Sequence, residues 1–262
     1  MNLVYAPHPL FKAHVDVVGR DQAPVLAIDN FCSEPGRLVE AAELAFARET
    51  RRRAGFPGLV AAADQTFARS TVAHLMPILC KTFGVSGRVQ NGGFDFQLMT
   101  SLPEDLSPAQ MRPHYDVPDT DVIASVLFLC RPPFLGTAFY RHNASGFEVI
   151  SPERVATYEA ALPLEGIGAL ESIGALESIG ALEGTGPLEG IGALEGNGAK
   201  TGYMTGDTAE FTQIANYGAS FNRMILFSAA NLHSGCAVRD HGFSCDPKVG
   251  RLTANLFLKF AK

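Results

Sequence analysis

The sequence lacks the long apolar runs that mark membrane spans and secretion signals. Residues 1–20 contain no apolar core of signal-peptide length, and no later stretch approaches the length of a bilayer span. It also lacks an excess of positive charge, because the formal net charge is -6. A general nucleic-acid binder would need a clustered basic surface. We therefore expect a cytoplasmic protein that binds neither membranes nor nucleic acids.

Paired cysteines are missing as well. The chain has 5 cysteines, an odd number, and none of them forms a Cys-x-x-Cys motif. This usage is typical of reduced thiols in a cytosol, and it argues against a disulfide framework or a cysteine-based zinc site. Cys80 and Cys130 lie in apolar runs and are expected to be packed side chains.

Helical patterns are confined to the amino-terminal third of the chain. A helix is expected from a Ser33 cap to about Thr50, and the basic run at 51–53 would be its solvated end. A second helix is expected over 66–83, with a kink or break at Pro77. Short strands should surround these helices, at residues 2–5, 13–18 and 24–28.

Strand patterns dominate the chain after a predicted turn at 91–93. The run 122–130 is almost continuously apolar, as in a strand that is buried on both faces. The fold class is therefore mainly β with accessory helices, and the length of 262 residues fits one domain. We divide residues 1–262 into amino-terminal strands and helices, 1–90, and a β core, 91–262. The other expected strands are 94–99, 138–141, 221–227 and 252–260.

A perfect hexapeptide repeat interrupts the β core at 163–198, in six copies such as ALESIG and ALEGTG. A period of six could indicate a left-handed β-helix, but six hexads would form only two coils. With a glycine ending every hexad, such coils would hardly offset their ordering entropy. We favour a flexible acidic insertion, and a lid over the site is an open alternative.

The most informative motif is His114-Tyr115-Asp116. Side chains two residues apart on an extended chain point to the same face, so this imidazole and this carboxylate should lie side by side. They would provide two of the three ligands of the 2-His-1-carboxylate triad that binds Fe(II). His233, which follows an apolar strand and a short polar break, is the best candidate for the third ligand. Cys236, three residues after His233, is expected to be a small residue of the site wall, with an approach to the metal as an alternative.

A second pair of residues begins the last strand. Arg251 carries the side chain best shaped to hold a carboxylate through two hydrogen bonds. Thr253 lies two residues further on, so its hydroxyl should point to the same group. Lys248 and Arg239 are alternatives to this arginine, but they lie in a connection and would be aimed less rigidly.

Together these motifs resemble the Fe(II)/2-oxoglutarate-dependent oxygenases of the double-stranded β-helix (jelly-roll or cupin-like) fold. The resemblance is closest to their prolyl-hydroxylase-like branch, and within it to a bacterial family of unknown function with a Gln-x-x-Pro-His-x-Asp box. It implies iron held by His114, Asp116 and His233, with 2-oxoglutarate and O2 as cosubstrates. It also implies that Arg251 and Thr253 bind the distal carboxylate of 2-oxoglutarate.

Three further residues are candidates for supporting roles around the cosubstrate: Gln97, Tyr140 and Asn222. Gln97 is a polar residue on an otherwise apolar strand, so it could face the pocket. For Tyr140, filling the barrel is an equal alternative to donating its hydroxyl. In the halogenases of this superfamily a small residue replaces the carboxylate ligand and chloride binds the iron, so the resemblance together with Asp116 implies hydroxylation of an unactivated C–H bond as the default reaction. Desaturation and ring formation stay open alternatives, and the substrate would be a small amino-acid-like, peptide or natural-product molecule.

Two other classes of function remain open from the sequence. The same barrel could bind a metal without catalysis, as an interaction or sensor protein. It could also hold zinc and act as a hydrolase, but Arg251 and Thr253 would then have no evident purpose.

Overall fold

The computed structural model describes residues 3–53, 55–131, 133–162, 202–239 and 243–261. In these ranges the chain forms ten strands and three α-helices, which confirms the mainly β fold class. The hexapeptide repeat, 163–198, lies outside the described residues.

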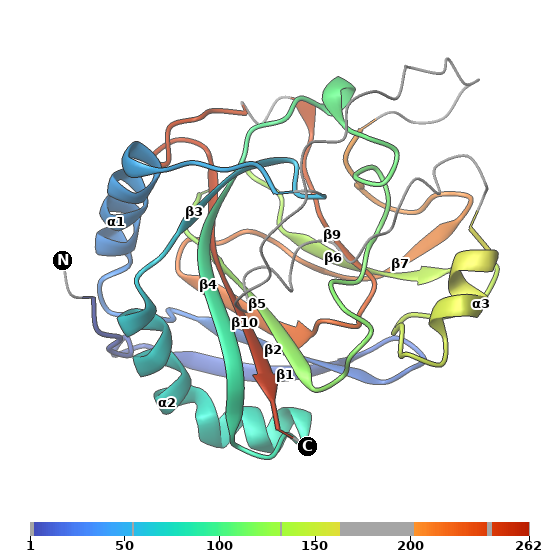
Figure 1. Cartoon of the computed structure of the whole chain (residues 1–262), viewed down its shortest axis with the longest axis horizontal. Coiled ribbons are helices and arrows are strands. Elements are labelled where there is room, and N and C mark those ends of the chain that lie inside the picture. Colours follow the sequence, from blue (N-terminus) through green and yellow to red (C-terminus); the bar gives the residue numbers. More distant parts are fainter. Residues whose placement is uncertain (1–2, 54, 132, 163–201, 240–242, 262) are drawn as a thin grey trace.

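The strands form two antiparallel sheets (Figure 1). The larger sheet has seven strands in the order β1-β2-β8-β5-β10-β4-β3, and the smaller has three in the order β7-β6-β9. The larger sheet consists of β1 (Lys12–Val18), β2 (Ala23–Asp29), β8 (Arg223–Ser228), β5 (Val122–Phe128), β10 (Arg251–Phe260), β4 (Val89–Met99) and β3 (Gly58–Ala62), and the smaller of β7 (Phe211–Tyr217), β6 (Thr137–His142) and β9 (His233–Gly235).

The two sheets face each other across an apolar cluster. Phe128 and Phe227 from the larger sheet pack in this cluster with Phe139 from the smaller one. Phe139 and Phe227 are in edge contact, with ring centroids 4.9 Å apart. The larger sheet lies on one side of this interior and the smaller on the other, which is the arrangement of a double-stranded β-helix.

The alternation of residues along β10 explains how this barrel is built. Leu252 and Ala254 point to the outer face of the larger sheet, where they belong to a second apolar cluster with residues of the helices. Thr253 and Asn255 point to the inner face and line a pocket. Because side chains alternate along a strand, one strand serves both the outer core and the site.

Two helices cover the outer face of the larger sheet, α1 (Pro35–Arg48) and α2 (Gln65–Phe83), and Figure 1 shows them on the same side of the molecule. The second helix begins at Asp64, whose side chain accepts a hydrogen bond from the Thr66 amide at 2.7 Å. It contains Pro77 and ends at Gly84, which has a left-handed φ of 67°.

The third helix, α3 (Val155–Ala160), lies at the other side of the molecule, beside the smaller sheet (Figure 1). Its Tyr158 packs in a third cluster with Tyr140 and Phe211 of that sheet. The molecule therefore has helices outside both sheets and a pocket between them.

Several expectations about the amino-terminal part were wrong. Residues 3–5 form no strand, and the first helix is capped by the backbone of Glu34 without a side-chain hydrogen bond. The predicted turn at 91–93 is instead part of the long strand β4. The strands that the amino-terminal part does form belong to the main sheet, where β2 pairs with β8 and β3 pairs with β4.

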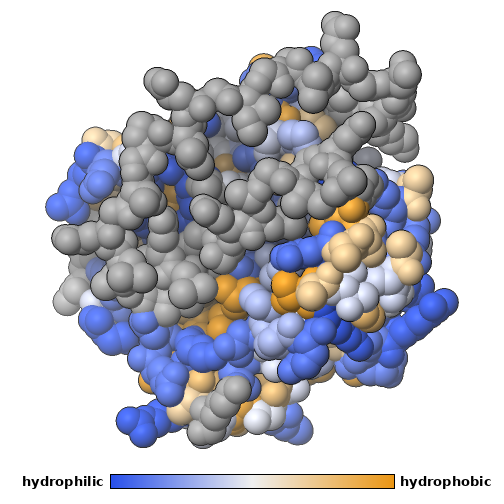
Figure 2. All heavy atoms as spheres, turned by 45° about the vertical axis from the view of Figure 1, so that its right-hand side comes forward, coloured by the Kyte–Doolittle hydropathy of each residue, from blue (hydrophilic) through white to orange (hydrophobic). Residues whose placement is uncertain are grey.

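The described part of the surface carries few large apolar side chains. On the face drawn in Figure 2, hydrophilic residues cover most of the described surface, and the hydrophobic atoms form small areas between them. None of the described helices combines the length and apolar character that a membrane crossing requires. The exposed large apolar residues are Val4, Leu10, Val15, Val17, Leu44, Leu102, Val238 and Val249.

Candidate metal centre and pocket

Three side chains that the sequence predicted to cooperate meet at one end of the barrel interior. The Nε2 atoms of His114 and His233 lie 3.9 and 3.7 Å from the two carboxylate oxygens of Asp116. One potential ligand atom from each residue can be chosen so that all three lie within 4.8 Å of one another. Two imidazoles and one carboxylate in this arrangement can hold a divalent metal and leave coordination positions open.

Backbone hydrogen bonds fix these residues in place. His114 forms an isolated antiparallel bridge with His233 and so extends the smaller sheet beyond β9. The amide N–H of Asp116 donates to the carbonyl oxygen of Ala229 at 2.8 Å. His114 therefore lies in a β-bridge and Asp116 at a bend two residues later, and their side chains meet, as the two-residue spacing predicted.

The orientation of the His233 ring is set by its other nitrogen. Nδ1 lies 2.9 Å from the carbonyl oxygen of Asn231, so the N–H at Nδ1 donates there. The lone pair of Nε2 is then free to bind a metal beside Asp116.

The electrostatic environment of the three residues favours a bound cation. Asp116 is buried, and its Oδ2 has no hydrogen-bond partner within the part of the chain that the structure describes. Burial raises the pKa of Asp116, while His233 and Arg53 oppose this rise. Burial, and then the nearby His233, lowers the pKa of His114 well below 6.5, so its imidazole is neutral, as a metal ligand must be.

Arg251 lies in the same pocket and is almost completely buried, with 5% of its surface exposed. Its Nε donates to the carbonyl oxygen of Leu135 at 3.1 Å, and its Nη2 to that of Gly136 at 2.7 Å. No acidic side chain pairs with this guanidinium among the described residues. Burial lowers the pKa of Arg251, as expected for a buried charge without a counter-ion.

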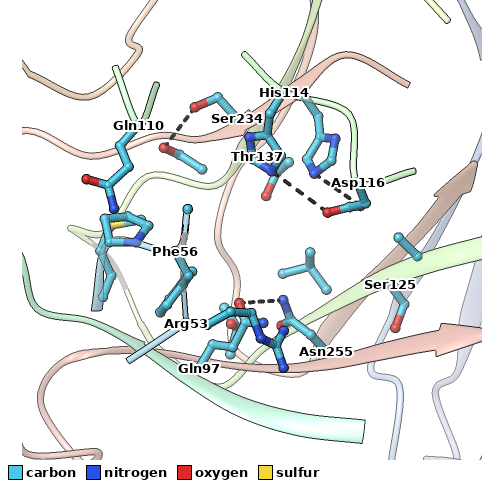
Figure 3. Close-up of a pocket in the computed structure, with 18 of the residues that line it drawn as sticks. Arg53, Phe56, Gln97, Gln110, His114, Asp116, Ser125, Thr137, Ser234 and Asn255 are labelled. Atoms are coloured by element: carbon cyan, nitrogen blue, oxygen red, sulfur yellow. Dashed lines mark hydrogen bonds and ion pairs between the residues drawn. The ribbon is translucent and has the colours of Figure 1, made fainter. Parts of the chain in front are cut away.

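The pocket that contains these groups is lined by both sheets and by the segment before β3 (Figure 3). Thr253 and Gln97 line it, as expected from their positions on β10 and β4. The lining residues are Arg53, Gly55, Phe56, Pro57, Gln97, Met99, Gln110, His114, Asp116, Ala124, Ser125, Val126, Thr137, Tyr203, Phe227, His233, Ser234, Gly235, Arg251, Thr253, Asn255 and Phe257.

Two of the residues predicted to support the cosubstrate do not line this pocket. Tyr140 is fully buried in the third cluster, on the outer side of the smaller sheet, with its hydroxyl 4.0 Å from Cys236 Sγ. Asn222 has a left-handed φ of 67° and its side chain binds both the amide and the carbonyl of Cys32. It therefore anchors the segment before α1 to the start of β8.

The alternative basic anchors also lie elsewhere. Lys248 is exposed and pairs with Glu43 of α1 at 2.7 Å. Arg239 is exposed and pairs with Glu104 at 2.9 Å. His142 does not line the pocket, and its Nδ1 atom lies 2.9 Å from Ser145 Oγ; His241 lies outside the described residues.

The sequence did not reveal the role of Arg53. The first helix ends at Arg48, so the basic run does not continue it, and the prediction of a solvated helix end was wrong. The side chain of Arg53 is only 7% exposed, and it forms an ion pair with Asp95 of β4 while also lining the pocket. The alternation of Asp95 with Phe94 and Phe96 was the one signal for a polar residue on the inner face.

Comparisons with known proteins give a family and little else. Residues 9–166 and 192–258 match a family described as "Family of unknown function (DUF6445)". No curated protein matches the sequence. Among solved structures, a non-heme alpha ketoglutarate dependent epimerase, SnoN from nogalamycin biosynthesis, is similar with a TM-score of 0.46 and 11% identity, over 90% of this chain and 78% of that chain. A similarity at this level carries no argument about activity.

Proposed function

From its site we propose that this chain, which belongs to the DUF6445 family of unknown function, is a non-haem Fe(II)/2-oxoglutarate-dependent oxygenase. The match to the family covers most of the sequence, but the family has no assigned activity, so the proposal rests on the chain's own residues. We further propose that residues 1–262 act as one catalytic domain, of the prolyl-hydroxylase-like kind.

His114, Asp116 and His233 would hold the iron. The unpartnered Oδ2 of Asp116 supports this assignment, because a buried carboxylate oxygen without a partner is costly unless a cation satisfies it. Bound Fe(II), with 2-oxoglutarate and O2, supplies the oxidising chemistry that breaks an unactivated C–H bond. The contribution of this chain would be to hold two imidazoles and one carboxylate so that one ligand atom of each meets at the same place.

The observation that carries the proposal is the buried Arg251, which has no acidic partner among the described residues and lies in the same pocket as this triad. A buried guanidinium is stabilised only when an anion neutralises it. The distal carboxylate of 2-oxoglutarate would do so, and its 2-oxo acid end would reach the metal. Thr253, on the same face of β10, would donate its hydroxyl to the same carboxylate.

Apolar side chains in the pocket would exclude water from the reacting carbon. Phe227 and Phe257 line its inner wall, and Met99 and Phe56 line the side near β3. With Asp116 as a ligand the default outcome is hydroxylation.

The test is turnover of carboxyl-labelled 2-oxoglutarate. The protein is loaded with Fe(II) in the absence of oxygen and given 2-oxoglutarate labelled at C1, the carboxyl group next to the keto group. When O2 is admitted, it should release labelled CO2 and form succinate, slowly if no substrate is present. The Asp116→Ala variant should not. If the protein loaded with Zn(II) hydrolyses esters or amides and never consumes 2-oxoglutarate, it is a hydrolase. If it binds metal and 2-oxoglutarate without any turnover, it is a sensor or interaction protein.

A further inference from the structure

A second polar group in the pocket includes neither the proposed metal ligands nor the residues proposed to bind the distal carboxylate of 2-oxoglutarate; Gln97, a candidate for supporting the cosubstrate, is one of its members. The group consists of Arg53, Gln97 and Asn255, which Figure 3 shows together on one side of the pocket, across from His114 and Asp116. These three residues come from the segment before β3, from β4 and from β10. We call them the Arg53 group.

Arg53 brings a buried guanidinium to the pocket and shares its acidic partner, Asp95, with Arg51. Both oxygens of Asp95 are used, Oδ1 by Arg51 at 3.2 Å and Oδ2 by Arg53. Two guanidinium groups therefore share a single carboxylate. The Arg51 side chain is 51% exposed and is screened by water, whereas that of Arg53 is 7% exposed and borders the pocket.

Among the described residues, the two amides of the Arg53 group leave N–H donors and one carbonyl acceptor without a partner. Asn255 Nδ2 donates to Gln97 Oε1 at 2.9 Å, so the N–H bonds of Gln97 Nε2 remain available. Asn255 is buried, with 9% of its surface exposed, yet its Oδ1 has no partner among the described residues. If both amides are turned over, the pair still presents one N–H donor and one carbonyl acceptor.

A ligand that satisfies this group must therefore offer a hydrogen-bond acceptor to the guanidinium and the amide N–H, and a hydrogen-bond donor close to that acceptor; an anionic acceptor suits the guanidinium best. A carboxylate would accept from Arg53 and Gln97, and an adjacent N–H would donate to Asn255 Oδ1. The apolar lining residues Val126, Phe227 and Phe257 suit the hydrocarbon part of such a ligand.

We propose that the substrate carries a free carboxylate beside an N–H group, as an amino acid, an N-acyl amino acid or a peptide carboxyl terminus does, and that the Arg53 group binds this end. The inference rests on the proposed function, because it assumes that the opposite side of the pocket holds the metal. The carbon that reacts is then on the side chain of the bound residue, at a distance from the carboxylate.

The experiment uses Mn(II), which occupies the site without turnover, together with 2-oxoglutarate under argon. The probes are free L-amino acids, N-acetyl-L-amino acids and dipeptides, each with its methyl ester, and binding is measured by calorimetry. We expect at least one acid to bind about tenfold more tightly than its ester. Tight binding of a free amino acid would identify a free amino acid as the substrate, whereas tight binding of an N-acetyl amino acid or a dipeptide would identify an acylated amino acid or a peptide carboxyl terminus. Binding of no acid in preference to its ester would overturn the inference.

Two variants assign the preference to the Arg53 group. Arg53→Met should remove about tenfold or more of the affinity for the acid. Arg51→Met is the matched control, because it takes one arginine from the same Asp95 but does not touch the pocket, and it should change the affinity less than about twofold. Equal losses in the two variants would overturn the assignment.

A second variant covers the case in which Arg53→Met does not fold. Asn255→Leu is similar in size and should weaken acids that carry an N–H by about fivefold, but not the corresponding acids without nitrogen. Equal weakening of both kinds of acid would overturn the role of Asn255. In all variants the binding of 2-oxoglutarate to the Mn(II) protein should persist; its absence in the unmodified protein would refute the proposed function separately.

Discussion

His114 and His233 are joined twice through their backbones. The amide N–H of His114 donates to the carbonyl oxygen of His233 at 2.9 Å, and the reverse bond is 2.8 Å. Their ring centroids are consequently only 4.4 Å apart. The pair is thus held in position before any metal binds. Asp116 completes the triad, but its buried carboxylate lowers the stability of the metal-free protein.

That cost predicts a pH-dependent stability. Burial raises the pKa of Asp116 in the folded protein above 3.8, its value in the unfolded chain. At pH values between the unfolded-chain pKa and the raised pKa, the folded protein therefore binds more protons than the unfolded chain. The stability of the metal-free protein should therefore fall as the pH rises through this window and remain lower above it. Asp116→Asn should remove the fall and add on the order of 1–3 kcal/mol at neutral pH.

Urea denaturation of the metal-free proteins at a series of pH values checks this prediction. Using the difference between the variant and the unmodified protein removes the opposite contribution of His114, whose pKa is lowered. A variant that is less stable than the unmodified protein at neutral pH would show that the carboxylate is not strained without metal.

Arg251→Lys tests the cosubstrate anchor. Lysine keeps the charge but lacks the planar guanidinium. It therefore cannot donate to the carbonyl oxygens of Leu135 and Gly136 and at the same time bind a carboxylate through two parallel hydrogen bonds. The affinity for 2-oxoglutarate should fall by on the order of 1.5–3 kcal/mol, with little change in metal affinity. Lys248→Met and Arg239→Met are controls and should have no effect, because both side chains are exposed in other ion pairs.

Gly136→Ala should disturb the same anchor through the backbone. A Cβ at this position would lie 1.7 Å from the carbonyl oxygen of Tyr217, a backbone atom of the paired strand β7. The substitution should cost about 2–3 kcal/mol of stability and weaken 2-oxoglutarate binding, since the Gly136 carbonyl holds Arg251. Gly218→Ala, which has no atom within 4 Å of its Cβ, is the control. Equal thermal shifts in the two variants would contradict the argument.

Excision of 163–198, in whole hexads, should leave the fold intact. Leu162 and Met204, on either side of the excised segment, pack in the same apolar cluster. The family match omits 167–191, within the repeat. Because loop length changes closure entropy only by about 0.6 kcal/mol per doubling, the melting temperature should change by less than about 3 °C. A much larger loss would show that the hexads contribute to the folded core.

The parts of the site that the sequence predicted are those governed by local periodicity. The alternation on β10 placed Thr253 toward the pocket, and the two-residue spacing placed His114 beside Asp116. Gln97 was found in the same way. In each case one strand, considered alone, determines which face a side chain occupies.

What the sequence did not predict depends on contacts between distant segments. Arg53 looked like a helix end because the partner that buries it, Asp95, lies on β4. The turn-like residues 91–93 are held in a strand by pairing with Lys259, Leu258 and Phe257 of β10. Tyr140 faces outward because the pairing of β6 decides which of its faces meets the interior, and Asn222 has a structural role that its sequence neighbours do not show.

The most direct test of the account is calorimetric titration of 2-oxoglutarate into the protein under argon, with and without Fe(II). The account predicts one site that requires the metal, that is lost in His114→Ala, Asp116→Ala and His233→Ala, and that is weakened in Arg251→Lys. The same affinity in the presence and absence of Fe(II), or an unchanged affinity in the Asp116→Ala protein, would contradict the claim that this pocket is a metal and 2-oxoglutarate site.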